Sequence, residues 1–90
     1  MKRGRKVKTF NPVTESQLKR IGEHIRQLRK DKGYSSHEMF AFDHDIARAQ
    51  FLSYENGRNM ELSSLIKIAA AFEMDLKTFF ETLPPVEQID

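Results

Sequence analysis

Ninety residues permit one small domain, close to the lower size limit for a self-sufficient hydrophobic core. The chain has seven phenylalanines but no cysteine, which excludes disulfides and thiolate metal sites and fits a reducing compartment. No apolar run approaches the roughly 18 residues that a membrane span needs, and no apolar signal segment follows the basic start. We therefore expect a cytoplasmic protein without a membrane partner.

The net charge of +2 conceals an uneven distribution along the chain. Residues 1–14 hold five basic residues and no acid, whereas residues 15–90 hold ten basic and thirteen acidic residues. We expect residues 1–13 to form a flexible arm, in which Lys2, Arg3, Arg5 and Lys6 contact DNA phosphates. The alternatives are an arm in the minor groove and a merely solvated tail. The acidic remainder confines any DNA-binding face to a local surface.

The first helix is expected to begin at Thr14, because Thr14 and Gln17 have the spacing of a capping box. Apolar residues then recur at spacings of three and four, which predicts one buried face: Leu18, Ile21, Ile25 and Leu28. Gly22 lies inside this helix at a propensity cost of about 1 kcal/mol. That cost predicts a close approach by another helix at Gly22.

Two short helices are expected next, separated by a tight turn, which is the helix-turn-helix arrangement. Ser35 or Ser36 can cap the first, and Asp45 is the expected N-cap of the second, over about residues 46–56. Gly57 accepts the left-handed conformation that ends a helix.

The second short helix has an uncluttered polar face: Arg48, Ala49, Gln50 and Ser53. Arg and Gln form paired hydrogen bonds with guanine and adenine, Ser can bond to either, and Ala permits close approach and touches thymine methyls. We interpret these four residues as DNA base contacts. The alternative is an ordinary surface helix of a bundle, because every short amphipathic helix shows two faces.

The chain is then expected to form a helix over residues 62–72 and a short helix over 76–82 capped by Asp75. The buried side of the former should hold Leu62, Leu65, Ile66, Ala69 and Phe72, and the latter should contribute Leu76, Phe79 and Phe80 to the core. Pro84 and Pro85 stop the helix. The expected domain thus spans residues 14–83, followed by a tail over 84–90.

Several segments taken together resemble the Cro/C1-type (XRE-like) helix-turn-helix family of phage repressors and bacterial transcriptional regulators. The most specific are Leu28-Arg29 and Tyr54-Glu55-Asn56-Gly57, within a likeness that covers about residues 18–82. The resemblance implies an all-α, five-helix, lambda-repressor-like fold that binds double-stranded DNA sequence-specifically. It further implies a transcriptional regulator, a repressor rather than an activator, acting as a homodimer on a two-fold-related site.

The resemblance also implies roles for particular residues. Arg29 and Glu55 match a structural ion pair that ties the recognition helix to the first helix. Four further residues fall where the family contacts DNA phosphates: Ser36, His37, Asn56 and Arg58. Asp45 departs from the family pattern, which often has glycine in this turn.

Some residues suggest functions other than DNA binding. Leu52 and Phe42 would be exposed and apolar, which suggests a protein-binding module such as an antitoxin or adaptor. No activated nucleophile or glycine-rich phosphate loop is evident, so we expect no enzyme and no cofactor. His44 lies between Asp43 and Asp45, but adjacent residues lack the spacing of a zinc site, so no metal is expected.

Overall fold

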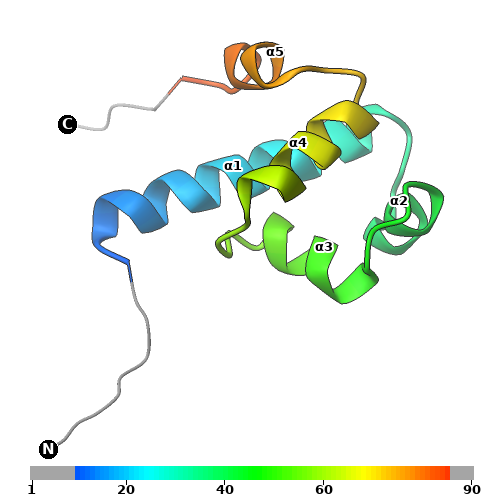
Figure 1. The fold of residues 1–90 in the computed structure, drawn as a ribbon, viewed down its shortest axis with the longest axis horizontal. Coiled ribbons are helices and arrows are strands. Elements are labelled where there is room, and N and C mark those ends of the chain that lie inside the picture. The colour runs from blue at the N-terminus through cyan, green and yellow to red at the C-terminus, as the bar shows by residue number, and fades with distance from the viewer. Residues whose placement is uncertain (1–9, 86–90) are drawn as a thin grey trace, which may run out of the picture.

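The structure is a computed structural model that describes residues 10–85, and in this part of the chain it contains five helices and no strand. The helices are α1 (Pro12–Asp31), α2 (His37–Asp43), α3 (Arg48–Glu55), α4 (Leu62–Ala71) and α5 (Leu76–Glu81). The long α1 crosses the molecule, α3 packs against α1 and α2, and α5 packs against α4 (Figure 1). The expected all-α, five-helix fold is confirmed. No helix in the described range has the length and apolar character to cross a membrane.

The start of α1 differs from the prediction. The N-cap is Asn11, whose side-chain oxygen accepts a hydrogen bond from the amide of Thr14 at 2.8 Å. Pro12 follows, and proline suits the first helical position because it has no amide hydrogen to satisfy there. The expected capping box beginning at Thr14 is therefore wrong, because an asparagine–proline pair starts the helix two residues earlier.

The turn between α2 and α3 also differs. Ser36 caps α2, but Asp45 does not cap α3: the N-cap is Ala47, which makes no side-chain capping bond. Asp45 instead lies in the turn with a φ of +58°, the left-handed conformation for which glycine is favoured. Its carbonyl oxygen accepts a hydrogen bond from Lys67 at 2.7 Å, which ties the turn to α4. The recognition helix consequently begins at Arg48 and not at residue 46.

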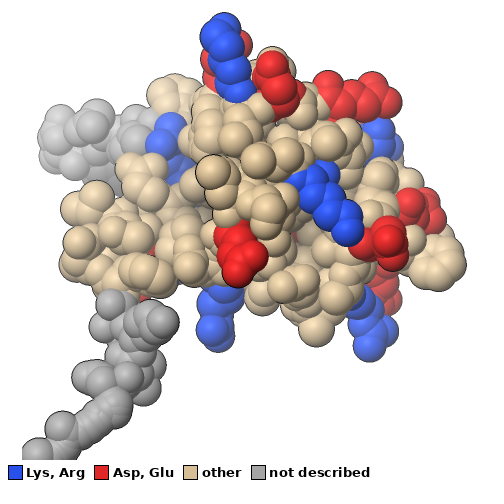
Figure 2. Space-filling view, in the orientation of Figure 1, with Lys and Arg blue, Asp and Glu red and all other residues tan. Residues whose placement is uncertain are grey.

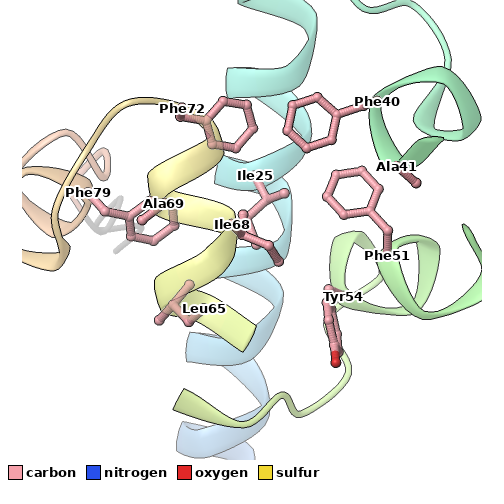
Figure 3. Close-up of a cluster of buried hydrophobic side chains, with 10 residues drawn as sticks. All are labelled: Ile25, Phe40, Ala41, Phe51, Tyr54, Leu65, Ile68, Ala69, Phe72 and Phe79. Carbon is pink, nitrogen blue, oxygen red and sulfur yellow. The ribbon is translucent and has the colours of Figure 1, made fainter. Parts of the chain in front are cut away.

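The core draws residues from all five helices and centres on aromatic rings (Figure 3). Phe40 of α2 stacks against both Phe51 of α3 and Phe72 after α4, with ring centroids 4.9 Å apart in each case. Phe40, Phe51 and Phe79 are fully buried. Since aromatic residues dominate core energetics in a small domain, these rings fix how α2 and α3 sit on the rest of the fold.

Gly22 lies where α1 meets the end of α3. A Cβ atom added there would lie 2.5 Å from the carbonyl oxygen of Tyr54 and 2.7 Å from that of Glu55. Both contacts are far below van der Waals distance and involve backbone, which a rotamer change cannot relieve. The predicted close approach at Gly22 is confirmed, and it brings the end of α3 directly against α1.

Three side chains predicted to be buried are exposed. Leu62 and Ile66 of α4 are 62% and 49% exposed, and Phe80 of α5 is 43% exposed. Leu65, Ile68 and Ala69 form the buried side of α4 instead. Apolar residues occupy more than one face of α4, so their spacing alone does not identify the face that packs against the core.

The segment after α5 returns to α1. His24 is buried and places Nε2 3.0 Å from Oγ1 of Thr82, while its ring packs against Phe79 with centroids 5.0 Å apart. Arg20 donates hydrogen bonds from its guanidinium to the carbonyl oxygen of Pro84. Two side chains of α1 thus hold the end of the described chain.

Candidate nucleic-acid interface

The first turn of α3 holds most of the predicted base-contacting residues. Arg48, Ala49 and Gln50 are its first three residues, and all three are exposed. At about 100° per residue, Phe51, Tyr54 and Glu55 face the core, so Ala49 and Ser53 lie near the centre of the opposite face. Arg48 lies to one side of this centre, and Gln50 lies to the other side, toward α4. Helix-turn-helix proteins read bases with the N-terminal residues of the second helix, and the short side chains at the centre permit such an approach.

Two of the four predicted base contacts have partners within the protein. Nη1 of Arg48 lies 3.3 Å from Oε2 of Glu38 on α2, in a pair whose side chains are 69% and 56% exposed. The hydroxyl of Ser53 donates to the carbonyl oxygen of Gln50 at 2.7 Å, so it can only accept from a base unless it rotates. Arg48 can exchange its partner at little cost, because exposed ion pairs are weak.

The predicted phosphate contacts lie at both ends of the helix-turn-helix unit. Oγ of Ser36 accepts the amides of Glu38 and Met39 at 3.0 and 3.4 Å, which leaves its hydroxyl hydrogen free to donate. His37 is the first residue of α2, and Asn56 and Arg58 are exposed after α3. The arm residues Lys2, Arg3, Arg5 and Lys6 lie outside the described residues.

The end of α3 is attached to α1 by a buried ion pair. Nε of Arg29 donates to Oε2 of Glu55 at 2.7 Å, and Nη2 donates to Oε1 at 3.2 Å. Nη1 of Arg29 donates to the carbonyl oxygen of Tyr34 at 2.9 Å, so the same guanidinium also holds the loop before α2. One guanidinium therefore joins α1, the α1–α2 loop and the recognition helix.

Two residues of this surface, Arg26 and Glu38, were not predicted from the sequence. Arg26 lies 3.5 Å from the Glu55 carboxylate and donates to the side-chain oxygen of Asn56 at 3.1 Å. Its position one helical turn before Arg29 was the available signal, because residues three apart share a helix face. Glu38 offered no comparable signal, since it meets Arg48 only through the turn between α2 and α3.

Charge on the described surface is mixed. Figure 2 shows one face, on which Lys and Arg side chains lie apart from one another among acidic ones, with basic side chains projecting at the lower edge where Figure 1 places α3. Among residues 10–85, no three His, Asp or Glu side chains gather as a metal site would require. His44 instead places Nδ1 2.9 Å from the carbonyl oxygen of Phe40.

A sequence profile described as the Cro/C1-type HTH DNA-binding domain matches residues 24–85. The chain belongs to this family. The match includes α2, α3 and the turn between them. The chain is accordingly a sequence-specific DNA-binding transcriptional regulator.

This Cro/C1-type protein is similar to several control or controller proteins. The control protein C.MunI from Mycoplasma sp is 38% identical over 65 residues, covering 71% of this chain and 88% of the relative. The crystal structure of the restriction-modification controller protein C.AhdI from Aeromonas hydrophila superposes with a TM-score of 0.64 at 32% identity, covering 72% and 98% of the two chains. Wild-type C.Esp1396I, also a restriction-modification controller protein, gives a TM-score of 0.63 at 30% identity, covering 73% and 86%.

Proposed function

We propose that this regulator is a controller protein for the genes of a restriction–modification system. The observation that supports the proposal is the likeness to the controller proteins C.MunI and C.AhdI, which covers more than two thirds of this chain and nearly all of C.AhdI. The regulator would bind DNA in the promoter region of such genes, and its location would be the cytoplasm.

The proposed binding mode inserts the first turn of α3 into the major groove. Arg48, Ala49, Gln50 and Ser53 would contact bases, with Arg48 and Gln50 supplying the discriminating hydrogen bonds. Phosphates on either side would be held by Ser36 and His37 at the start of α2 and by Asn56 and Arg58 after α3. The basic part of the arm, residues 1–9, precedes α1 and would add sequence-independent affinity.

We propose a homodimer that uses the exposed face of α4. Leu62, Ile66 and Ala70 recur every four residues and form an exposed apolar stripe. A second copy could cover this stripe, and the two recognition helices would then meet related half-sites about one helical turn of DNA apart. Ile66→Lys should shift the protein from dimer to monomer in sedimentation analysis, whereas Phe42→Lys on α2 should not.

Binding to a different protein is the alternative explanation for the exposed apolar residues. Of the two residues that suggest such a partner from the sequence, Phe42 is 82% exposed and Leu52 is 36% exposed, and Met39, on the same helix as Phe42, is 56% exposed. If the protein is an adaptor that binds another protein through this surface, its affinity for that partner should depend little on salt concentration. A DNA binder that contacts several phosphates should instead lose affinity steeply as salt rises.

Selection of bound duplexes from a random pool tests the proposal directly. We expect a two-fold-related consensus, and the same motif should occur upstream of restriction or modification genes in the source genome. A reporter placed behind that motif should respond to expression of the protein. Selection that yields no consensus, or a consensus absent from such promoters, would contradict the assignment.

A further inference from the structure

The end of α3 makes a second contact with α1, besides the ion pair of Arg29 and Glu55. Nη2 of Arg26 donates to Oδ1 of Asn56 at 3.1 Å. A guanidinium has only donors, so the atom of Asn56 that faces it must be the oxygen. The amide nitrogen of Asn56 is therefore directed away from Arg26, with two hydrogens to donate, which is the polarity that a phosphate oxygen requires.

Asn56 lies on the side of α3 that is exposed for DNA. Ala49, Ser53 and Asn56 follow one another at spacings of four and three, so Asn56 continues the face that Ala49 and Ser53 begin. Asn56 is the C-cap residue of α3, and its own amide is already used in hydrogen bonds to the last turn of the helix. Of its hydrogen-bond donors, only the side-chain amide is therefore left for a ligand.

The charge at this point favours an anion. The buried carboxylate of Glu55 is held at two points by Arg29 and also lies 3.5 Å from Nε of Arg26, so the two guanidinium groups together carry one more charge than it neutralises. The hollow beside Asn56 is lined by Lys19 and Arg26 against one further carboxylate, that of Glu23. The Arg26 side chain is 41% exposed and therefore reaches solvent beside Asn56.

We propose that Arg26 is a positioning residue for a DNA backbone contact. It holds the side-chain oxygen of Asn56, so that the amide nitrogen donates to a phosphate, and it places a positive charge next to that phosphate. This inference rests on the proposed assignment of Asn56 as a phosphate contact and adds α1 to the DNA-binding surface.

The test measures binding to a mixed-sequence 30-base-pair duplex over a series of KCl concentrations, because phosphate contacts do not depend on sequence. The variants are Arg26→Ala, Asn56→Ala, the double variant, and Arg26→Lys. Arg20→Ala is the matched control, since it removes the same charge from the same helix, at a residue that contacts Pro84 instead.

Arg26→Ala and Asn56→Ala should each weaken binding about tenfold. The loss of affinity in the double variant should be much smaller than the product of the two single losses, because Asn56 is no longer oriented once Arg26 is removed. Arg26→Ala should also make the salt dependence shallower by roughly 0.9, the value for one phosphate contact. Arg26→Lys keeps the charge but lacks the planar fork, so it should retain the salt slope and still weaken binding, because Asn56 is less firmly oriented.

Three results would overturn the inference. Losses in the double variant that simply multiply would show that Arg26 does not act through Asn56. An equal change of salt slope in Arg20→Ala would reduce the effect to net charge. If Asn56→Ala binds the duplex as tightly as the wild type does, Asn56 does not contact a phosphate, and this inference fails with that assignment. The DNA-binding role of the protein would still stand, because the wild type binds the duplex. Melting temperatures show which variants fail to fold. If Arg26→Ala is unfolded, the comparison uses Arg26→Lys in its place.

Discussion

Arg29 and Glu55 form a buried, two-point ion pair between the last turn of α1 and the last residue of the recognition helix. Glu55→Gln would preserve shape but leave the guanidinium without its charged partner. Breaking one side of a buried pair costs about 3–5 kcal/mol. We therefore expect a fall in melting temperature of at least about 12 °C, measured by circular dichroism.

Glu81→Gln is the control for this change, since Glu81 forms an exposed pair with Lys77 at 2.8 Å. Exposed pairs contribute little, so its melting temperature should stay close to that of the wild type. A Glu55→Gln protein that melts normally and fails only in DNA binding would contradict the structural role of the pair.

Arg48 and Gln50 should act as base readers. Replacing either with Ala should cost about 1–3 kcal/mol on the selected duplex and relax the preference at one base position. Binding-site selection repeated with each variant measures this directly. Equal weakening on all duplexes would make the residue a phosphate contact instead.

Gly22→Ala should destabilise the protein although it improves helix propensity. Ala gains about 1 kcal/mol over Gly inside a helix. The added methyl group would meet backbone atoms of Tyr54, Glu55 and Gly57 at 2.5 to 2.9 Å, so α3 must shift away from α1. We expect a lower midpoint in urea unfolding, and weaker DNA binding because the recognition helix moves. A more stable variant would show that the contact relaxes freely.

The stability of the protein should fall as the pH drops from about 7 toward 5. Burial lowers the pKa of His24 below its usual value, and the nearby positive charge of Arg20 acts in the same direction. A histidine with a lowered pKa in the folded state stabilises the fold fully above its unfolded pKa of about 6.5. That contribution declines as the pH falls below 6.5 and is lost once the pH passes the folded pKa.

The measurement is the melting temperature of the wild type and of His24→Gln at several pH values. Glutamine is neutral throughout and can still bond to Thr82. The wild type should lose more stability than the variant between pH 7 and pH 5. Parallel curves would assign the acid sensitivity to other groups.

Deletion of residues 1–9 should weaken binding to every duplex and make the salt dependence shallower, by roughly 0.9 for each lost phosphate contact. The deletion must spare Asn11, because its side chain caps α1. An unchanged slope would reduce the arm to a solvated tail. A selective loss at an A·T-rich flank would instead indicate minor-groove reading.

Local sequence determined much of this protein. The stop at Gly57, the Ser36 cap and the run Tyr54-Glu55-Asn56-Gly57 located the helix-turn-helix unit and its exposed polar face, because turn and cap chemistry acts over a few residues. The same local reasoning gave the wrong role for Asp45. Aspartate is a good N-cap residue, but Asp45 occupies a left-handed position in the turn instead.

Tertiary structure alone decided which apolar face of α4 is buried and which side chains meet across helices. Leu65 packs inward while Leu62 and Ile66 face outward, because the packing of neighbouring helices selects one of two similar faces. The contact of Arg26 with Asn56 joins residues 30 positions apart. Spacing along one helix predicts which residues share its face, but it carries no information about what the fold brings against that face.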